Sequence, residues 1–80
     1  MTEKWFVLIN PAAAGHKAGK HWPVIAELLH EAGINFEHQF STSAADAVQQ
    51  VTTAIDQGYR KLIAVGGDGT LNLAVNGILQ

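Results

Sequence analysis

LIAVGGDGT, residues 62–70, is the stretch that decides how this sequence folds. Its apolar first half predicts a buried strand, and the periodic apolar residues of 71–79 predict a helix after the turn. The glycines at 66, 67 and 69 let the chain turn sharply and let a ligand approach the main chain. Free N–H groups and the dipole at a helix start favour an anion, so the stretch is typical of a phosphate-binding turn.

Asp68 is the acidic residue of this turn. A carboxylate repels bare phosphate, whereas a Mg²⁺ ion that bridges carboxylate and phosphate oxygens removes the conflict. We therefore expect a magnesium–nucleotide site with Asp68 as the metal ligand. A P-loop is excluded because no lysine follows Gly69, and the dinucleotide fingerprint is excluded because Asn72 stands where its third glycine belongs. A tight turn that binds nothing is the alternative.

The composition limits the classes of protein that this chain can represent. Its 80 residues form at most one small domain, and the apolar fraction of 48% is ordinary for a globular chain. The absence of cysteine excludes disulfides and thiolate metal sites. A net charge of −2 and a pI near 6.0 give no electrostatic reason to expect nucleic acid. We find no signal peptide and no transmembrane-length apolar run, so a cytoplasmic chain is expected.

The first half of the chain predicts two strands with a helix between them. The uninterrupted apolar run of 5–9 predicts a strand buried on both faces. The period-two pattern of 34–40 predicts a second strand, nearer a sheet edge. Between them we expect a flexible, positively charged loop at 10–20 and a helix at 21–32 that stops at Gly33.

The second half repeats the alternation. Ser43 and Asp46 resemble a capping box at the start of a helix, which Gly58 closes. A strand at 62–65 and a helix at about 70–79 follow. We expect the inward face of that last helix to carry Leu71, Ala74, Val75, Ile78 and Leu79.

This βαβαβα order predicts an α/β fold, with a parallel sheet between two helical layers. Ligands of such sheets bind beyond the carboxyl ends of the strands, so segments 10–20, 41–43 and 66–70 should line one crevice. The chain looks incomplete, because the last helix normally crosses to a further strand and an edge of the sheet stays open. The open edge and an under-packed terminal helix predict a homo-oligomer, most simply a dimer.

Several further side chains invite a functional interpretation that we do not favour. The four histidines lack a shared spacing for metal binding, and we expect His30 and His38 to be partly buried and hydrogen-bonded. Trp5 and Trp22 are expected in the core. The lysines of the 10–20 loop, Lys17 and Lys20, could reach a phosphate, but a solvated loop lysine is the favoured interpretation.

Three motifs together resemble a known family. They are NPAAAG at 10–15 after the first strand, STSAADA at 41–47 before the second helix, and GGDGTLN at 66–72 followed by Asn76-Gly77. The whole chain resembles the N-terminal part of the diacylglycerol kinase catalytic domain, in the bacterial lipid kinase family that is also similar to sphingosine and ceramide kinases. This resemblance implies a Rossmann-like or phosphofructokinase-like nucleotide-binding lobe.

The resemblance also implies an activity and its site residues. It implies transfer of the ATP γ-phosphate to the hydroxyl of a lipid such as diacylglycerol, with Mg²⁺, by an enzyme that meets the membrane without spanning it. The nucleotide site implied by the motif match comprises Asn10, Ser41, Gly66, Gly67, Asp68, Gly69, Thr70 and Asn72. Two positions depart from the family pattern: Ala45 replaces a glycine, and Leu73 replaces a glutamate.

The family's second, β-rich lobe carries the acidic general base, a further metal site and much of the lipid surface. Those parts lie outside these 80 residues, so we expect the chain alone to be catalytically inactive. Two alternatives stay open: a lobe of a kinase related to NAD kinase or phosphofructokinase, and a folded fragment without catalysis.

Overall fold

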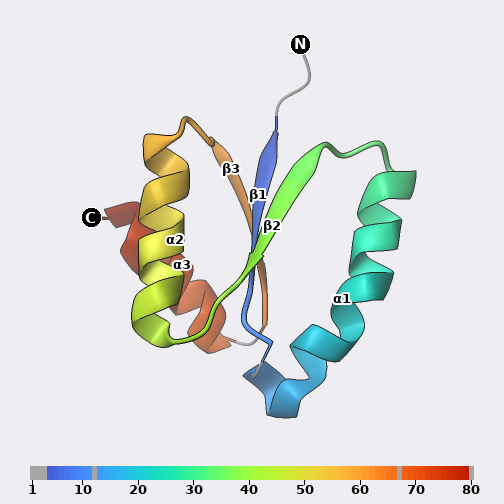
Figure 1. Ribbon diagram of the computed structural model, residues 1–80, viewed down its shortest axis with the longest axis horizontal. Helices are drawn as coiled ribbons and strands as arrows, with labels where there is room; N and C mark the ends of the chain where they lie inside the picture. The colour runs from blue at the N-terminus through green and yellow to red at the C-terminus, as the bar shows by residue number, and fades with distance from the viewer. Residues whose placement is uncertain (1–3, 12, 67, 80) are drawn as a thin grey trace.

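The computed structural model describes residues 4–11, 13–66 and 68–79; for 13–16, 68, 69 and 71 only the backbone is described (Figure 1). Strands and helices alternate as the sequence predicts. In chain order they are β1 (Trp5–Ile9), α1 (Ala13–Glu31), β2 (Phe36–Phe40), α2 (Ala44–Asp56), β3 (Lys61–Val65) and α3 (Asp68–Leu79).

The three strands form one parallel sheet in the order β2-β1-β3. In the register of the sheet, Trp5 of β1 lies opposite Phe36 on one side and Lys61 on the other. The predicted α/β class is therefore confirmed, and so is the position of β2 at an edge.

Helices cover both faces of this sheet, which gives three layers (Figure 1). On one face, Val7 and Ile9 of β1 pack with Trp22 of α1. On the other face, Phe6 and Leu8 pack with residues of α2 and α3. Since alternate side chains of a strand point to opposite faces, a central strand covered on both sides must be apolar throughout. This explains the unbroken WFVLI run of β1.

The predicted loop at 10–20 is wrong, because α1 begins at Ala13 and includes Pro23 in its interior. Alanine is the strongest helix former, and the alanines of this segment outweigh its two glycines. Gly19 has a packing role: a Cβ atom there would lie 3.0 Å from Cβ of Pro11. The glycine therefore lets α1 pass close to the turn that follows β1.

Both predicted helix stops are confirmed. Gly33 and Gly58 have positive φ angles of 75° and 99°, which glycine adopts without steric cost. After α1, the N–H of Gly33 donates to the carbonyl of His30, and that of Ile34 donates to the carbonyl of Leu29. The Gly58 turn repeats this pattern after α2. These are the paired bonds of a Schellman motif, which ends a helix and leads the chain into the next strand.

The predicted inward face of α3 is only partly right. Ala74 is buried, but Val75, Ile78 and Leu79 are 41%, 50% and 77% exposed. The reason is that α3 packs against α2 through small residues: a Cβ atom on the buried Gly77 would lie 2.6 Å from Cβ of Val51. The close approach of the two helices, rather than the hydrophobic period, sets the buried face.

Candidate functional site

The carboxyl ends of the three strands and the first turns of the three helices lie together at one edge of the molecule (Figure 1, bottom). Each strand leads within a few residues into a helix, so α1, α2 and α3 all begin there. The first turn of a helix exposes N–H groups and carries the positive end of its dipole. Three such ends favour an anionic ligand at this edge.

The larger opening at this edge is a cleft of about 580 Å³ on the side of α2 and α3. Among the described residues, those that line it carry no charge; they are Asn10, Pro11, Ser41, Thr42, Ser43, Ala44 and Leu73. The structure thus brings together two predicted site residues, Asn10 and Ser41, from different strand ends. Leu73, one of the departures from the family pattern, gives this wall an apolar side chain.

A smaller opening of about 230 Å³ lies on the α1 side of the same edge. Its described lining comprises Lys17, Ala18, His21, Ile25, Val65 and Gly66. Gly66, the first residue of the predicted phosphate turn, therefore faces this opening. The backbone N–H of Asn10 donates to the carbonyl of Val65 at 3.0 Å, which joins the ends of β1 and β3 between the two openings.

The remaining predicted site residues belong to the start of α3. Gly67 lies outside the described residues, and so does the side chain of Asp68, although the backbone of Asp68 and Gly69 forms the first turn of α3. Asn72 is exposed. Thr70 is only 1% exposed, and its buried Oγ1 has no hydrogen-bond partner among the described residues. A buried hydroxyl without a partner is costly.

Ser41 is held against β1. Its backbone N–H donates to the carbonyl of Ile9 at 2.8 Å, and its Oγ donates to the same oxygen at 3.2 Å. The hydroxyl proton is therefore committed to the protein, and Ser41 can offer a ligand only the remaining acceptor capacity of Oγ.

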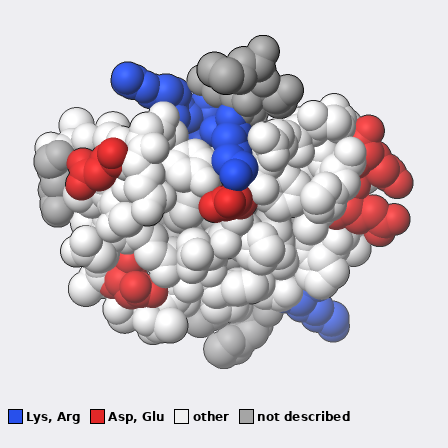
Figure 2. Space-filling view, turned by 45° about the horizontal axis from the view of Figure 1, so that its top comes forward, with Lys and Arg blue, Asp and Glu red and all other residues white. Residues whose placement is uncertain are grey.

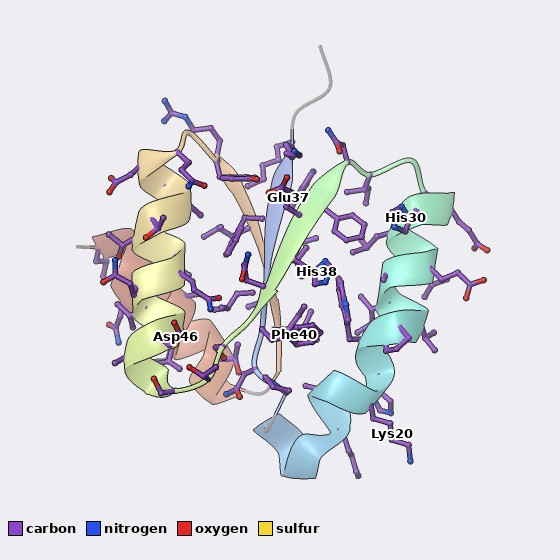
Figure 3. All side chains as sticks on the ribbon, viewed as in Figure 1. Lys20, His30, Glu37, His38, Phe40 and Asp46 are labelled. Carbon is purple, nitrogen blue, oxygen red and sulfur yellow. The ribbon has the colours of Figure 1, made fainter. Side chains whose placement is uncertain are left out.

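Asp46 fixes the rest of the 41–43 segment from the first turn of α2 (Figure 3). Its Oδ2 accepts from the backbone N–H of Thr42 at 2.8 Å, from the Thr42 hydroxyl at 3.1 Å and from Nε2 of Gln50 at 2.9 Å. Ser43 Oγ in turn accepts from the N–H of Asp46 at 3.0 Å, so the predicted cap is confirmed. In a capping box, the carboxylate of Asp46 would accept from the backbone N–H of Ser43. Here it accepts from the N–H of Thr42, one residue earlier.

The predicted burial of His30 and His38 is wrong, because both side chains are exposed. They lie in the space between α1 and β2, where His38 meets the ring of Trp22 at 5.0 Å and His30 meets that of Phe36 at 4.9 Å (Figure 3). His38 lies on β2, which is an edge strand of the described sheet. Trp22 is in the core, as predicted. Within the described residues, no three acidic, histidine or cysteine side chains converge as a metal site would require.

The amino ends of the strands carry a separate charge network. Lys4 Nζ donates to Glu37 Oε1 at 3.0 Å, and the hydroxyl of Tyr59 donates to Glu37 Oε2 at 3.0 Å. The hydrogen bond from Lys4 is the main cause of the lowered pKa of Glu37, and the same hydrogen bond raises the pKa of Lys4. Figure 2, which brings this end forward, shows basic side chains beside an acidic one. This network ties β1, β2 and the turn before β3 together, away from the two openings.

Thr42, Ser43 and Lys17 line these openings, as expected of segments 41–43 and 10–20, whereas Leu73 in the larger cleft and His21 in the smaller opening were not predicted. His21 was missed, and Lys17 was interpreted as a solvated lysine, because 10–20 was taken for a loop. On a helix, residues four apart share a face, so an earlier helix start would have placed Lys17 and His21 together.

Comparisons with known proteins agree with these motifs. Residues 4–80 match the family profile described as the diacylglycerol kinase catalytic domain. The chain is 30% identical over its whole length to a diacylglycerol kinase of Staphylococcus saprophyticus and 31% identical to one of Staphylococcus aureus. It spans about a quarter of the length of these relatives, 26% and 25% respectively. In the described part of the chain, no helix is both long enough and apolar enough to cross a membrane.

Proposed function

The chain belongs to the family of diacylglycerol kinase catalytic domains, and from that premise we propose that it forms the ATP-binding part of a lipid kinase. ATP would bind at the carboxyl edge of the sheet, and its γ-phosphate would pass to the hydroxyl of a lipid such as diacylglycerol. The observation that carries this proposal is that Asn10, Ser41 and Leu73 of α3 line one uncharged cleft, at the edge where three helices begin.

The start of α3 fits the phosphates of a nucleotide with its metal ion. Thr70 has a buried hydroxyl that lacks a partner among the described residues, and the first turn of α3 supplies N–H donors. Asp68 is the residue that would hold Mg²⁺, which on binding would neutralise charge on the phosphate oxygens. The protein's own contribution is to position the phosphates with main-chain donors and to exclude side chains at the glycines.

The proposal also covers phosphoryl transfer to lipid by the kinase as a whole. Relatives of about four times this length carry the name diacylglycerol kinase, and phosphoryl transfer needs a positioned acceptor and base besides a phosphate cradle. We therefore propose that the 80 residues alone bind nucleotide without turning over lipid, and that the kinase meets its substrate at a membrane surface from the cytoplasm. The exposed apolar residues of α3, Val75, Ile78 and Leu79, favour self-association, which sedimentation analysis would test.

Replacement of Asp68 with asparagine tests the proposed metal site. Because the carboxylate acts through Mg²⁺, Asp68→Asn is expected to weaken binding of Mg-ATP by about tenfold and to leave metal-free ATP nearly unchanged. Titration calorimetry with and without Mg²⁺ measures both. Asp56→Asn, at the far end of α2, removes the same charge away from the cleft and is the matched control. An equal loss with and without Mg²⁺ would show that Asp68 does not act through metal.

A further inference from the structure

We propose, on the basis of the proposed function, that Lys17 and His21 of α1 receive the phosphates of the nucleotide. The nucleotide would then bind in one orientation, with its nucleoside in the larger cleft and its phosphates beside Gly66 in the smaller opening. Neither residue belongs to the three family motifs of this sequence, so the motif match assigns them no role.

The positions of the two residues carry the first step. Lys17 and His21 lie four residues apart on α1, so they project from the same face of the helix. Both line the opening of about 230 Å³ together with Gly66. Gly66, the described end of the phosphate turn, and these two side chains thus line a single small space.

The contrast in charge between the two openings carries the second step. Among the described residues, the larger cleft is lined only by uncharged side chains, whereas the lining of the smaller opening includes Lys17. A triphosphate bears several negative charges and a nucleoside bears none. The complementary arrangement places the phosphates on the α1 side and the base and ribose on the α2 side.

The chain path permits one ligand to reach both openings. Asn10 lines the larger cleft, and its N–H is bonded to the carbonyl of Val65, which lines the smaller opening. The two openings are therefore neighbours on either side of this bond. The volume of the larger cleft, about 580 Å³, lies within the usual range of small-molecule sites.

Lys20 provides a matched control for Lys17. It is an exposed lysine of the same helix, but it does not line either opening, and its side chain points away from the sheet (Figure 3). The substitutions Lys17→Gln and Lys20→Gln therefore remove the same charge from the same helix. Comparing ATP with adenosine then separates contacts to phosphate from contacts to the nucleoside.

The experiment is a calorimetric titration of the chain and its variants with Mg-ATP and with adenosine. We expect Lys17→Gln to weaken ATP binding by about tenfold, the loss of one charge-assisted hydrogen bond, and to leave adenosine binding unchanged. His21→Gln should weaken ATP binding by a smaller factor, and Lys20→Gln should change neither ligand. Circular dichroism of each variant verifies that α1 is intact.

Two results would overturn this orientation while the proposed function stands. One is an equal loss of ATP affinity in Lys17→Gln and Lys20→Gln. That result would show that the net charge of α1, rather than contact between Lys17 and phosphate, affects the affinity. The other is an equal loss for ATP and adenosine in Lys17→Gln, which would place the nucleoside beside α1. If the unmodified chain binds no ATP, the proposed function fails, and the inference fails with it.

Discussion

Asp46 connects the stability of α2 to the shape of the larger cleft. Its carboxylate accepts three hydrogen bonds, two of them from Thr42 in the cleft wall. We expect Asp46→Ala to lower the free energy of unfolding by about 1.5–3 kcal/mol, because hydrogen bonds to a charged group are lost. Asp46→Asn, which keeps an acceptor oxygen, should lose less than half of that. Urea unfolding measures both, and equal losses in the two variants would contradict the assigned role of the carboxylate.

Single residues were predictable from sequence where local chemistry decides their role. Gly33, Gly58 and Ser43 do what their types do at helix ends, since a positive φ angle or a side-chain cap depends only on near neighbours. The hydroxyl of Thr70 was not predictable in the same way. Its burial depends on how α3 lies in the tertiary structure, and no local pattern carries that information.

Gly77 shows how the contact between two helices depends on the absence of one side chain. A Cβ atom there would lie 2.6 and 2.7 Å from Cβ and Cγ1 of Val51 and 3.1 Å from the carbonyl oxygen of Val48. We expect Gly77→Ala to destabilise the fold by about 1–2 kcal/mol, because overpacking outweighs the better helix propensity of alanine.

A double-mutant cycle with Val51→Ala provides the control for this prediction. Removing the side chain that the new methyl group meets should recover part of the loss, which would appear as a coupling between the two sites. Additive effects, or a stabilised Gly77→Ala variant, would show that the helices separate at no cost and that Gly77 does not set their approach.

The elements themselves were predicted with unequal success. β1 agrees residue for residue because its burial on both faces leaves one uninterrupted apolar signal. α1 was placed eight residues too late, since the glycines at 15 and 19 were taken as the sign of a flexible loop. The alanines of the segment favour the earlier start, and the glycine at 19, whose Cβ would lie 3.0 Å from Cβ of Pro11, lets α1 pass close to that turn. This error also assigned Lys17 to a loop and His21 to a helix, so the shared face of the two residues was not predicted.

At the scale of the whole molecule, the amino end of the sheet should make stability depend on pH. The hydrogen bond from Lys4 is the main cause that lowers the pKa of Glu37 from its usual value of 4.5. A lowered pKa means that the stabilisation is present above pH 4.5 and is lost as the pH falls through the folded-state value. The pKa values of Lys4 and Tyr59 are raised, so their contribution is lost at alkaline pH instead.

Urea unfolding of the unmodified chain and of Glu37→Gln across this range tests the assignment. The two proteins should differ most near neutral pH and should converge as the solution is acidified below pH 4.5. A difference that stays constant down to pH 2 would show that the carboxylate's charge does not stabilise the fold.

The central claim is that nucleotide binds at the carboxyl edge of the sheet, and amide chemical shifts on titration with Mg-ATP test it most directly. A competing cavity of about 320 Å³ lies at the opposite edge, lined in part by Lys4 and Arg60, and it too could attract phosphate. The account predicts that the shifts concentrate at Asn10, at 41–43 and at 66–72. Shifts confined to the surroundings of Lys4 and Arg60, with 66–72 unmoved, would contradict it.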